Sequence, residues 1–220
     1  MIELYFSPGA CSFVPHVGLQ AVQAAGGPAF EPKLIKLHRA EHKTEQFLAL
    51  NPEGQVPLLV VDGKPLNQIV AMCDWIDRSF PQAGLLPAES WARAQALSTL
   101  AWMNNTAHPT FTHVFMPDKF ADSEATRAEV RSVAVGKYRS LLERIAVMSQ
   151  AASPYWLGSG LSFLDAYALT LLRWGGLAGI DPDSMPGFKA YDDCVAAHPV
   201  VAAVIERERL QLNVFKKPAA

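Results

Sequence analysis

Within the first 80 residues, short apolar runs and helical patterns follow one another in an order that few folds accommodate. Residues 2–6 form an apolar run closed by Ser7-Pro8-Gly9, which predicts a buried strand that ends in a turn. Residues 13–25 carry apolar side chains at helical spacing, and residues 30–36 predict a second strand. A strand, a helix and a strand in this order predict a parallel pair with a right-handed crossover.

The rest of this segment adds a hairpin and a further helix. We expect a short helix at residues 44–50, a strand at residues 57–61 and a return strand at residues 64–66, because Asp62-Gly63 is a hairpin turn signal. From residue 69 to residue 80, apolar side chains return to helical spacing. The predicted unit is a small mixed sheet covered by helices, as in the thioredoxin fold.

Beyond Pro87 the patterns are helical throughout. The expected helices cover residues 91–116, 123–150, 187–197 and 200–210, and a further helix opens at Ser162-Phe163-Leu164-Asp165, a capping-box pattern. Residues 81–87 are rich in Pro, Gly and Leu and predict a linker. We therefore predict an α/β plus all-α protein, with a thioredoxin-like domain at residues 1–80 and an all-helical domain at residues 88–220.

Composition and charge argue against several classes of protein. The 220 residues carry 19 basic and 21 acidic side chains, and this balance does not indicate a nucleic-acid partner. The amino terminus lacks the features of a secretory signal, and no apolar run approaches the roughly 20 residues that span a bilayer. Three widely spaced cysteines favour a reducing compartment, so we expect a cytoplasmic protein with no membrane partner.

No metal centre is expected. His38 and His42 have a spacing that suits a metal on a helix, but their segment is polar and offers no third ligand. We interpret this segment as solvated surface. We interpret Glu206-Arg207-Glu208-Arg209 in the same way, as alternating charges on the solvated face of a terminal helix.

Cys11 is the cysteine that the sequence most favours as a reactive thiol. It is expected at the amino terminus of a helix, where the dipole and free N–H groups should hold the thiol pKa below its ordinary value of about 8.5. Ser12 is expected to cap that helix and to place its hydroxyl beside the thiol. Val14 stands where a Cys-x-x-Cys pair would need its second cysteine, which disfavours a dithiol oxidoreductase. The alternative for Cys11 is a small buried residue.

The other two thiols are expected to be inert. Cys73 and Cys194 fall on predicted helix faces and should be packed. The sequence therefore predicts that Cys11 is the most reactive of the three cysteines.

The segment Asn51-Pro52-Glu53-Gly54-Gln55-Val56-Pro57 predicts a turn followed by the start of a strand. A cis peptide bond between Val56 and Pro57 would turn the backbone N–H and C=O of Val56 toward a peptide ligand. Propensity alone favours the trans bond, because only about 5–6% of such bonds are cis.

Three of these motifs together resemble a known family. Residues 5–12, with Pro15-His16 behind them, resemble the amino terminus of the bacterial beta-class glutathione transferases. Residues 51–57 resemble the loop that holds a cis-proline in that superfamily, and Ser162 and Asp165 resemble its carboxy-terminal capping box. The likeness spans essentially the whole chain. It implies a cis Val56–Pro57 bond and glutathione as co-substrate.

The resemblance also implies roles for individual residues. Cys11 would face the glutathione sulfur, with Ser12 and His108 close to it. Val56 would pair through its backbone with the cysteinyl part of glutathione, beside the cis Pro57. The alternative for His108 is a helix residue with one routine hydrogen bond.

The helix that begins near residue 69 departs from the family. Its members usually have Glu or Gln followed by Ser or Thr there, to bind the γ-glutamyl carboxylate, whereas this chain has Gln68 and Ile69. The backbone N–H groups of both residues still suit a carboxylate. The missing hydroxyl should weaken glutathione binding by about 1.5–3 kcal/mol, roughly ten- to a hundredfold.

The favoured function is conjugation of glutathione thiolate to a small hydrophobic electrophile. The electrophile pocket is expected in the helical domain, where residues 106–120 hold an aromatic stripe whose alternative is plain core. Two other functions stay open. One is a glutathione-dependent thiol-disulfide reductase or dehalogenase that uses Cys11 covalently, and the other is a non-catalytic ligand-binding or scaffold protein on the same fold.

A homodimer is expected because the first long helix carries more apolar surface than one neighbour covers. The side chains concerned are Trp91, Ala94, Leu97, Ala101 and Trp102, extended by Met103 and Phe111. The resemblance places Asn105 and Thr106 near the glutathione of the neighbouring subunit.

Overall fold

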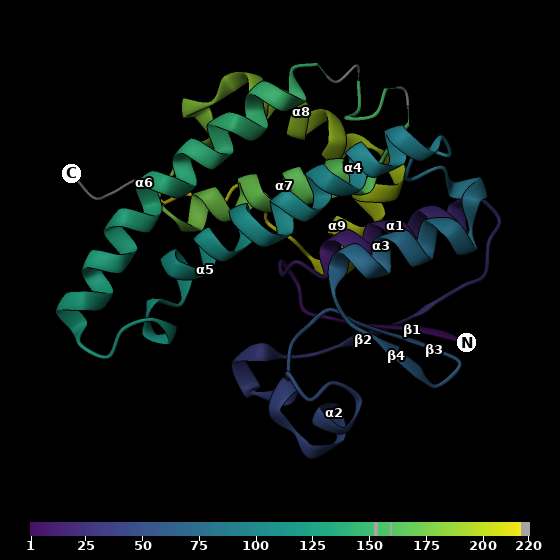
Figure 1. Cartoon of the computed structure of the whole chain (residues 1–220), viewed down its shortest axis with the longest axis horizontal. Coiled ribbons are helices and arrows are strands. Elements are labelled where there is room, and N and C mark those ends of the chain that lie inside the picture. The colour runs from purple at the N-terminus through teal and green to yellow at the C-terminus, as the bar shows by residue number, and fades with distance from the viewer. Residues whose placement is uncertain (152–153, 159, 217–220) are drawn as a thin grey trace.

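The computed structural model describes residues 1–151, 154–158 and 160–216. Within the predicted helical domain, residues 152–153, 159 and 217–220 lie outside the described residues. A four-stranded sheet occupies the amino-terminal part, and helices dominate the rest of the described chain (Figure 1). The predicted thioredoxin-like sheet followed by a helical region is confirmed.

The sheet has the strand order β2-β1-β3-β4. β1 (Ile2–Phe6) pairs parallel with β2 (Glu31–Leu34) and antiparallel with β3 (Leu58–Val61). β4 (Lys64–Leu66) returns antiparallel to β3 through the predicted turn. Each edge strand, β2 and β4, contains a proline, whose missing N–H is tolerated where one side of the strand is unpaired.

Helices cover both faces of the sheet. On one face α1 (Phe13–Ala24) and α3 (Ile69–Ser79) pack side by side (Figure 1). On the other face lies α2 (Glu45–Leu50), whose Phe47 ring meets Tyr5 of β1 with 5.8 Å between ring centroids. Two apolar clusters result, because successive side chains of a strand point to opposite faces.

The helical region follows the predicted order. Its helices are α4 (Ser90–Trp102), α5 (His108–Phe115), α6 (Glu124–Ser149), α7 (Phe163–Leu177), α8 (Pro186–Ala197) and α9 (Pro199–Glu208). A π-helical turn at Met103–Ala107 joins α4 to α5. Pro109 accounts for the wider turn, because proline has no N–H for the carbonyl four residues back and its ring crowds that carbonyl.

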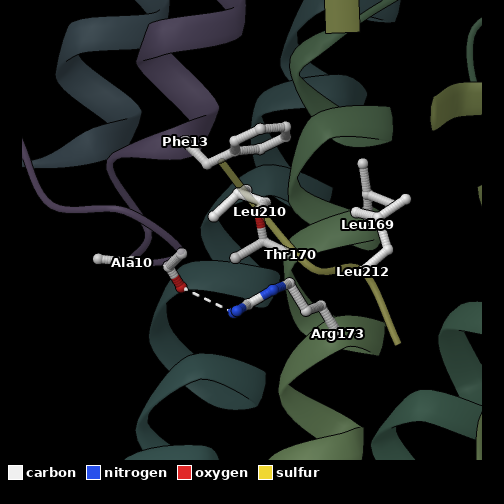
Figure 2. A pocket seen from close by; sticks show the side chains of 8 residues that line it. Ala10, Phe13, Leu169, Thr170, Arg173, Leu210 and Leu212 are labelled. Carbon is white, nitrogen blue, oxygen red and sulfur yellow. Dashed lines mark hydrogen bonds between the residues drawn. The ribbon is translucent and has the colours of Figure 1, made fainter. Parts of the chain in front are cut away.

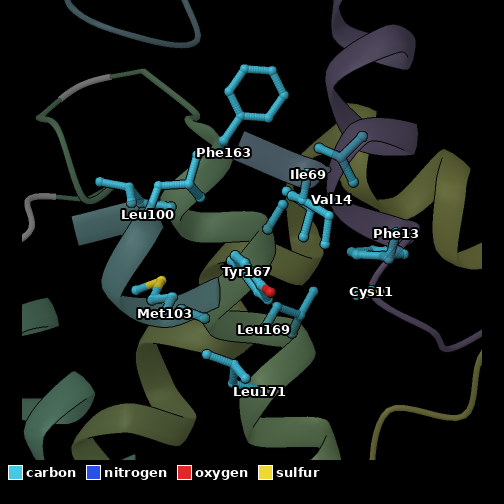
Figure 3. Packing of buried hydrophobic residues seen from close by; sticks show 14 of the residues in the cluster. Cys11, Phe13, Val14, Ile69, Leu100, Met103, Phe163, Tyr167, Leu169 and Leu171 are labelled. Carbon is cyan, nitrogen blue, oxygen red and sulfur yellow. The ribbon is translucent and has the colours of Figure 1, made fainter. Parts of the chain in front are cut away.

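Helix α7 runs through the core and is buried along most of its length. The predicted capping box closes its amino terminus: the carboxylate of Asp165 accepts the backbone N–H of Ser162 at 2.8 Å and its hydroxyl at 2.5 Å. Helix α1 approaches α7 so closely that a Cβ on Gly18 would lie 2.3 Å from the ring of Phe163. Figure 3 shows Phe163 and Tyr167 in the larger of the two apolar clusters, which α1, α3 and α7 share.

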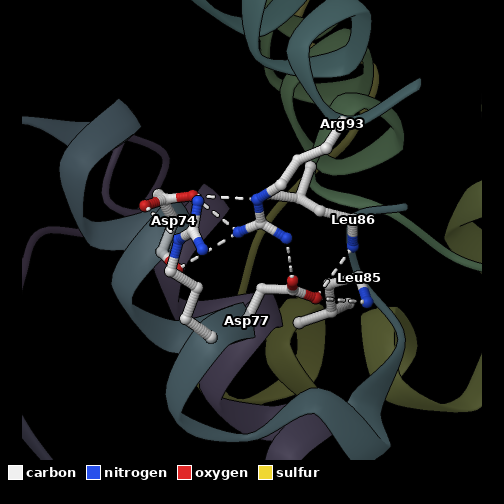
Figure 4. Close-up of polar contacts among 6 residues, drawn as sticks. Asp74, Asp77, Leu85, Leu86 and Arg93 are labelled. Carbon is white, nitrogen blue, oxygen red and sulfur yellow. Dashed lines mark hydrogen bonds and ion pairs between the residues drawn. The ribbon is translucent and has the colours of Figure 1, made fainter. Parts of the chain in front are cut away.

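The predicted linker at residues 81–87 is packed against α3. Leu85 and Leu86 are buried, and their backbone N–H groups donate to Oδ1 of Asp77 at 3.0 and 2.9 Å. Arg93 of α4 binds Oδ2 of Asp77 at 2.6 Å and Oδ1 of Asp74 at 2.6 Å (Figure 4). One guanidinium group therefore joins α3, next to the sheet, to the first helix of the helical region.

We expect Arg93→Ala to lower the free energy of unfolding by about 3–5 kcal/mol, because it leaves the buried carboxylate of Asp77 without its cation. Arg78→Ala is the matched control. Arg78 also pairs with Asp74, but its side chain is 65% exposed, and such a pair contributes about 0–1 kcal/mol. Urea unfolding followed by circular dichroism measures both variants, and equal losses would contradict a special role for Arg93.

Candidate functional site

The loop between β1 and α1 turns tightly at Gly9 and buries Cys11. Gly9 has a φ of 71°, in the left-handed region, and a Cβ there would lie 2.7 Å from the guanidinium of Arg173. Cys11 is 8% exposed, and its thiol donates to the carbonyl oxygen of Val56 at 3.6 Å. The structure therefore brings together two predicted site residues, Cys11 and Val56, that are 45 positions apart.

Ser12 does not cap α1 with its side chain. Its hydroxyl donates to the carbonyl of Ser7 at 3.1 Å and accepts the N–H of Ser7 at 3.1 Å, so it closes the loop instead. The predicted capping role is wrong, because Ser12 has helical backbone angles and a capping serine adopts an extended conformation. Ser12 is also fully buried.

Burial raises the pKa of the Cys11 thiol to about 12, although hydrogen bonds from the backbone of Cys11 and Ser12 favour the thiolate. The predicted lowering of this pKa is wrong, because the removal of the thiol from water outweighs the effect of the helix end.

Cys73 is buried as predicted, and burial raises its pKa as well. Cys194 on α8 is exposed, so the prediction that it is packed is wrong.

The peptide bond between Val56 and Pro57 is cis, as predicted. Asn51, which is 1% exposed, organises the loop before it: its side-chain amide donates to the carbonyl of Gln55 at 2.8 Å and its side-chain oxygen accepts the N–H of Glu53 at 3.3 Å. Pro57 is buried and Val56 is half-buried. Within residues 1–151, 154–158 and 160–216, no hydrogen bond occupies the N–H of Val56.

The amino end of α3 has no side-chain cap. Gln68 precedes the helix with a φ of 70° and an exposed side chain that makes no capping hydrogen bond. Ile69 is 4% exposed and packs in the same core cluster as Val14 of α1 (Figure 3). Because the Ile69 side chain faces the core, only its backbone N–H is available to a ligand.

His108, at the start of α5, is held by a chain of side-chain hydrogen bonds. Its Nδ1 lies 2.9 Å from the hydroxyl of Tyr167, which donates its only proton to Oδ1 of Asn104 at 3.0 Å. Nδ1 of His108 therefore carries a proton and donates to Tyr167. Burial lowers the pKa of His108 to about 4, so the imidazole is neutral at pH 7. No hydrogen bond joins His108 to Cys11 within the described part of the chain.

Trp174 connects His108 to the thiol loop, which is the segment of residues 7–12 between β1 and α1. Its indole N–H donates to the carbonyl of Gly9 at 2.9 Å, and its ring lies 4.8 Å from the ring of His108, centroid to centroid. Phe111 stacks on Trp174 at 4.7 Å and on Phe115 at 5.6 Å. Phe111 is core, whereas Phe115 is 55% exposed. A row of aromatic rings thus runs from the loop to the surface.

Asn105 and Thr106 lie in the π-helical turn, and both are exposed on the protomer. Oδ1 of Asn105 accepts a hydrogen bond from Asn104 at 2.9 Å, and the carbonyl of Thr106 accepts the hydroxyl of Thr110 at 2.8 Å. Both residues are therefore at the surface and available to another molecule.

Two hollows lie near the carboxy-terminal segment. The first is apolar, has a volume of about 10 Å³ and lies between the thiol loop, α7 and the residues after α9 (Figure 2). It holds no more than one water molecule, so it is not a substrate pocket. The second, of about 240 Å³, lies between α7, α8 and residues 212–214.

The described residues offer no group of three or more His, Cys, Asp or Glu side chains that could hold a metal ion. His38 and His42, whose spacing would suit a metal on a helix, lie on two separate short turns.

None of the helices within the described ranges has the length and apolar character to cross a membrane.

Sequence reasoning missed Glu208. Predicted to be solvated, it is 3% exposed, and its carboxylate accepts the N–H of Gly9 at 3.0 Å and pairs with His16 at 2.7 Å. Helical spacing could have indicated that Glu208 is buried, because Glu208 follows Val201 by seven residues and Val204 by four and so shares their face of the helix. Both valines are buried.

In the absence of ligand at pH 7, we expect iodoacetamide to label Cys194 first, Cys11 more slowly and Cys73 last. Thiolate fraction and access to solvent control this reaction, and Cys194 is the exposed thiol. Peptide mapping after short exposures measures the three rates in one sample. Faster labelling of Cys11 than of Cys194 would overturn this order and restore the prediction made from the sequence.

Comparison with known proteins places the chain in one family. The model of the "Glutathione S-transferase, N-terminal domain" matches residues 5–78. "Glutathione S-transferase GST-4.5" of Xanthomonas campestris pv. campestris is 31% identical over 95% of this chain and 100% of its own length. A sphingomonad glutathione S-transferase structure is 32% identical, with a TM-score of 0.80 over 95% of this chain and 100% of that one. A beta-class enzyme of Sphingomonas chungbukensis is 28% identical, with a TM-score of 0.80 over 94% and 98%. The chain belongs to the glutathione S-transferase family.

Proposed function

We propose that this protein conjugates glutathione to a small hydrophobic electrophile. The observation that carries the proposal is the contact of Cys11 with Val56, a buried thiol 3.6 Å from a backbone carbonyl in a loop that faces it. A peptide that contains a thiol fits this place, because its backbone can pair with the loop while its sulfur reaches Cys11. The sphingomonad relative was solved in complex with glutathione, which supports the same ligand here.

Glutathione would bind along two backbone segments. The N–H and C=O of Val56, next to the cis Pro57, would pair with its cysteinyl residue as an added strand does. The γ-glutamyl carboxylate would lie at the uncapped amino end of α3, on the N–H groups of Gln68 and Ile69. Backbone donors at a helix end bind a carboxylate without a charged side chain.

The proposed reaction needs a thiolate in a site built from neutral groups. The glutathione thiol passes its proton to solvent water, its sulfur forms a bond to the electrophilic carbon, and the leaving group departs with its electron pair. Cys11 would lie beside this sulfur, while Ser12, buried and hydrogen-bonded to Ser7, would hold the loop, and the amino end of α1 would stabilise the charge. His108 carries a proton on Nδ1, so its Nε2 is the atom that can accept one. The raised pKa of Cys11 disfavours the alternative in which Cys11 is itself the nucleophile.

The electrophile would bind on the helical side of the loop. The aromatic row of Trp174, Phe111 and Phe115 starts at the Gly9 carbonyl and ends at the surface. Flat apolar rings suit a small hydrophobic molecule. In this proposal residues 1–80 form the glutathione-binding domain, residues 88–220 supply the electrophile pocket, and the protein works in the cytoplasm.

Titration calorimetry with glutathione, followed by a conjugation assay with 1-chloro-2,4-dinitrobenzene, tests the function. We expect binding and turnover, and we expect Cys11→Ala to keep turnover within about tenfold of the parent, since Cys11 supplies one neutral contact to the sulfur. Cys194→Ala is the matched control and should change nothing. Absence of glutathione binding would contradict the proposal. Binding without turnover would favour a non-catalytic protein, and complete loss in Cys11→Ala would favour covalent chemistry.

We further propose that the protein is a homodimer. One face of α4 is buried and includes Arg93 and Leu100, whereas Trp91 on another face is 70% exposed. A two-fold repeat of the same patch is the commonest way for a soluble protein to cover such a face. In this dimer Asn105 and Thr106, both exposed on the protomer, would approach the glutathione of the second copy.

Sedimentation equilibrium at low micromolar concentration should give twice the chain mass of 24.0 kDa. Trp91→Glu should shift the mass toward the monomer, because a charge would be buried in the proposed interface. Leu177→Glu, at an exposed apolar residue near the end of α7, is the control and should leave the dimer intact. A parent protein that sediments as a monomer would rule out the dimer.

A further inference from the structure

A buried carboxylate at the end of α9 has no part in the chemistry proposed above. The side chains of Glu208 and His16 are both 0% exposed, and Oε1 of Glu208 lies 2.7 Å from Nδ1 of His16. The other carboxylate oxygen accepts the N–H of Gly9 at 3.0 Å. The carboxylate therefore joins the carboxy-terminal helix to the thiol loop and to α1, across 192 positions of sequence.

Arg207 determines where the imidazole proton lies. Its Nη1 is 3.3 Å from Nε2 of His16, and a guanidinium group has only donors. Nε2 of His16 is therefore the acceptor, and Nδ1 carries the proton that is donated to Glu208. Glu208 then receives two hydrogen bonds, one on each oxygen, from His16 and from Gly9.

Gly9 is also held through its carbonyl group. Its carbonyl accepts the indole N–H of Trp174 at 2.9 Å. It also accepts a hydrogen bond from Nη1 of Arg173 at 3.4 Å, drawn as the dashed line in Figure 2. The Nε of Arg173 donates in turn to the carbonyl of Gln211, beyond α9, at 2.9 Å. Three side chains from α7 and α9 thus hold one residue of the loop.

We infer that Glu208 is a positioning residue for Cys11. Its carboxylate fixes the Gly9 peptide, and the chain runs from there through Ala10 to Cys11. Gly9 also accepts a hydrogen bond from Trp174 on its carbonyl, and the Trp174 ring packs on His108, so a shift of Gly9 would move both groups that the proposed reaction places near the sulfur. The consequence for turnover rests on the proposed function, whereas the consequence for the Cys11 thiol does not.

The three cysteines provide the measurement, because they differ in burial within one molecule. We expect Glu208→Ala to raise the iodoacetamide rate of Cys11 relative to Cys194 by at least about tenfold, while Cys73 stays unlabelled, since a hydrogen bond to a charged group is lost. Glu208→Gln keeps the size of the side chain and an acceptor for Gly9, so its effect should be smaller. Glu206→Gln, at an exposed carboxylate of the same helix, is the matched control and should leave the ratio unchanged.

An unchanged ratio in folded Glu208→Ala would overturn the inference. If that variant unfolds, Glu208→Gln decides by the same ratio. Joint labelling of Cys11 and Cys73 in both variants would also overturn it, because Glu208 would then support the whole fold and not the loop.

Turnover provides a second readout. We expect kcat for glutathione conjugation to fall in Glu208→Ala by up to about tenfold, no more than in Cys11→Ala, with a smaller change in KM, because within the described residues no hydrogen bond joins Glu208 to the Val56 segment that would bind glutathione. An equal loss in Glu206→Gln would overturn the inference. A parent protein that lacks turnover would contradict the proposed function, and the labelling ratio would still test the role of Glu208.

Discussion

The rest of the structure depends on the burial of helix α1. From Phe13 to Leu19 every residue of this helix is buried, because it packs against the sheet, α3, α7 and α9. Gly18 permits the closest of these contacts, since any larger residue would meet the ring of Phe163. A helix enclosed in this way places the loop before it, with Cys11, where the amino-terminal and carboxy-terminal parts of the chain meet.

Two buried charged groups join these parts. Arg93 of α4 binds Asp77 and Asp74 of α3, and Glu208 of α9 binds His16 of α1 together with the thiol loop. A buried charge without its partner costs several kcal/mol, so each pair specifies one arrangement of the helices it joins. The Glu208 pair holds the loop that carries the thiol, whereas the Arg93 pair holds the far end of α3.

Burial also sets the electrostatics of the site. It raises the pKa of Cys11 and lowers the pKa of His108, so both side chains are uncharged at neutral pH. Charge on a bound thiolate then has to be stabilised by oriented dipoles, which keep their orientation in a site that excludes water. In the proposed function this part falls to the amino end of α1, which directly follows the loop that carries Cys11.

Local patterns in the sequence determined the elements of this protein and several of its turns. The cis bond before Pro57 was implied by the resemblance of residues 51–57 to a family motif, because propensity alone favours the trans bond. The strand–helix–strand order, the hairpin and the capping box of Ser162 and Asp165 follow from residues close together in the chain. Such features depend on spacing and backbone preference, which a short segment carries with it.

Tertiary packing alone decided which polar groups meet water. Local context predicts one environment for each of Ser12, Cys194 and Glu208, and the structure places all three in another. The pKa of Cys11 follows the same rule, because the burial that raises it comes from elements remote in sequence. A helical position shows which side chains share a face, but only the folded chain determines whether that face meets solvent or another helix.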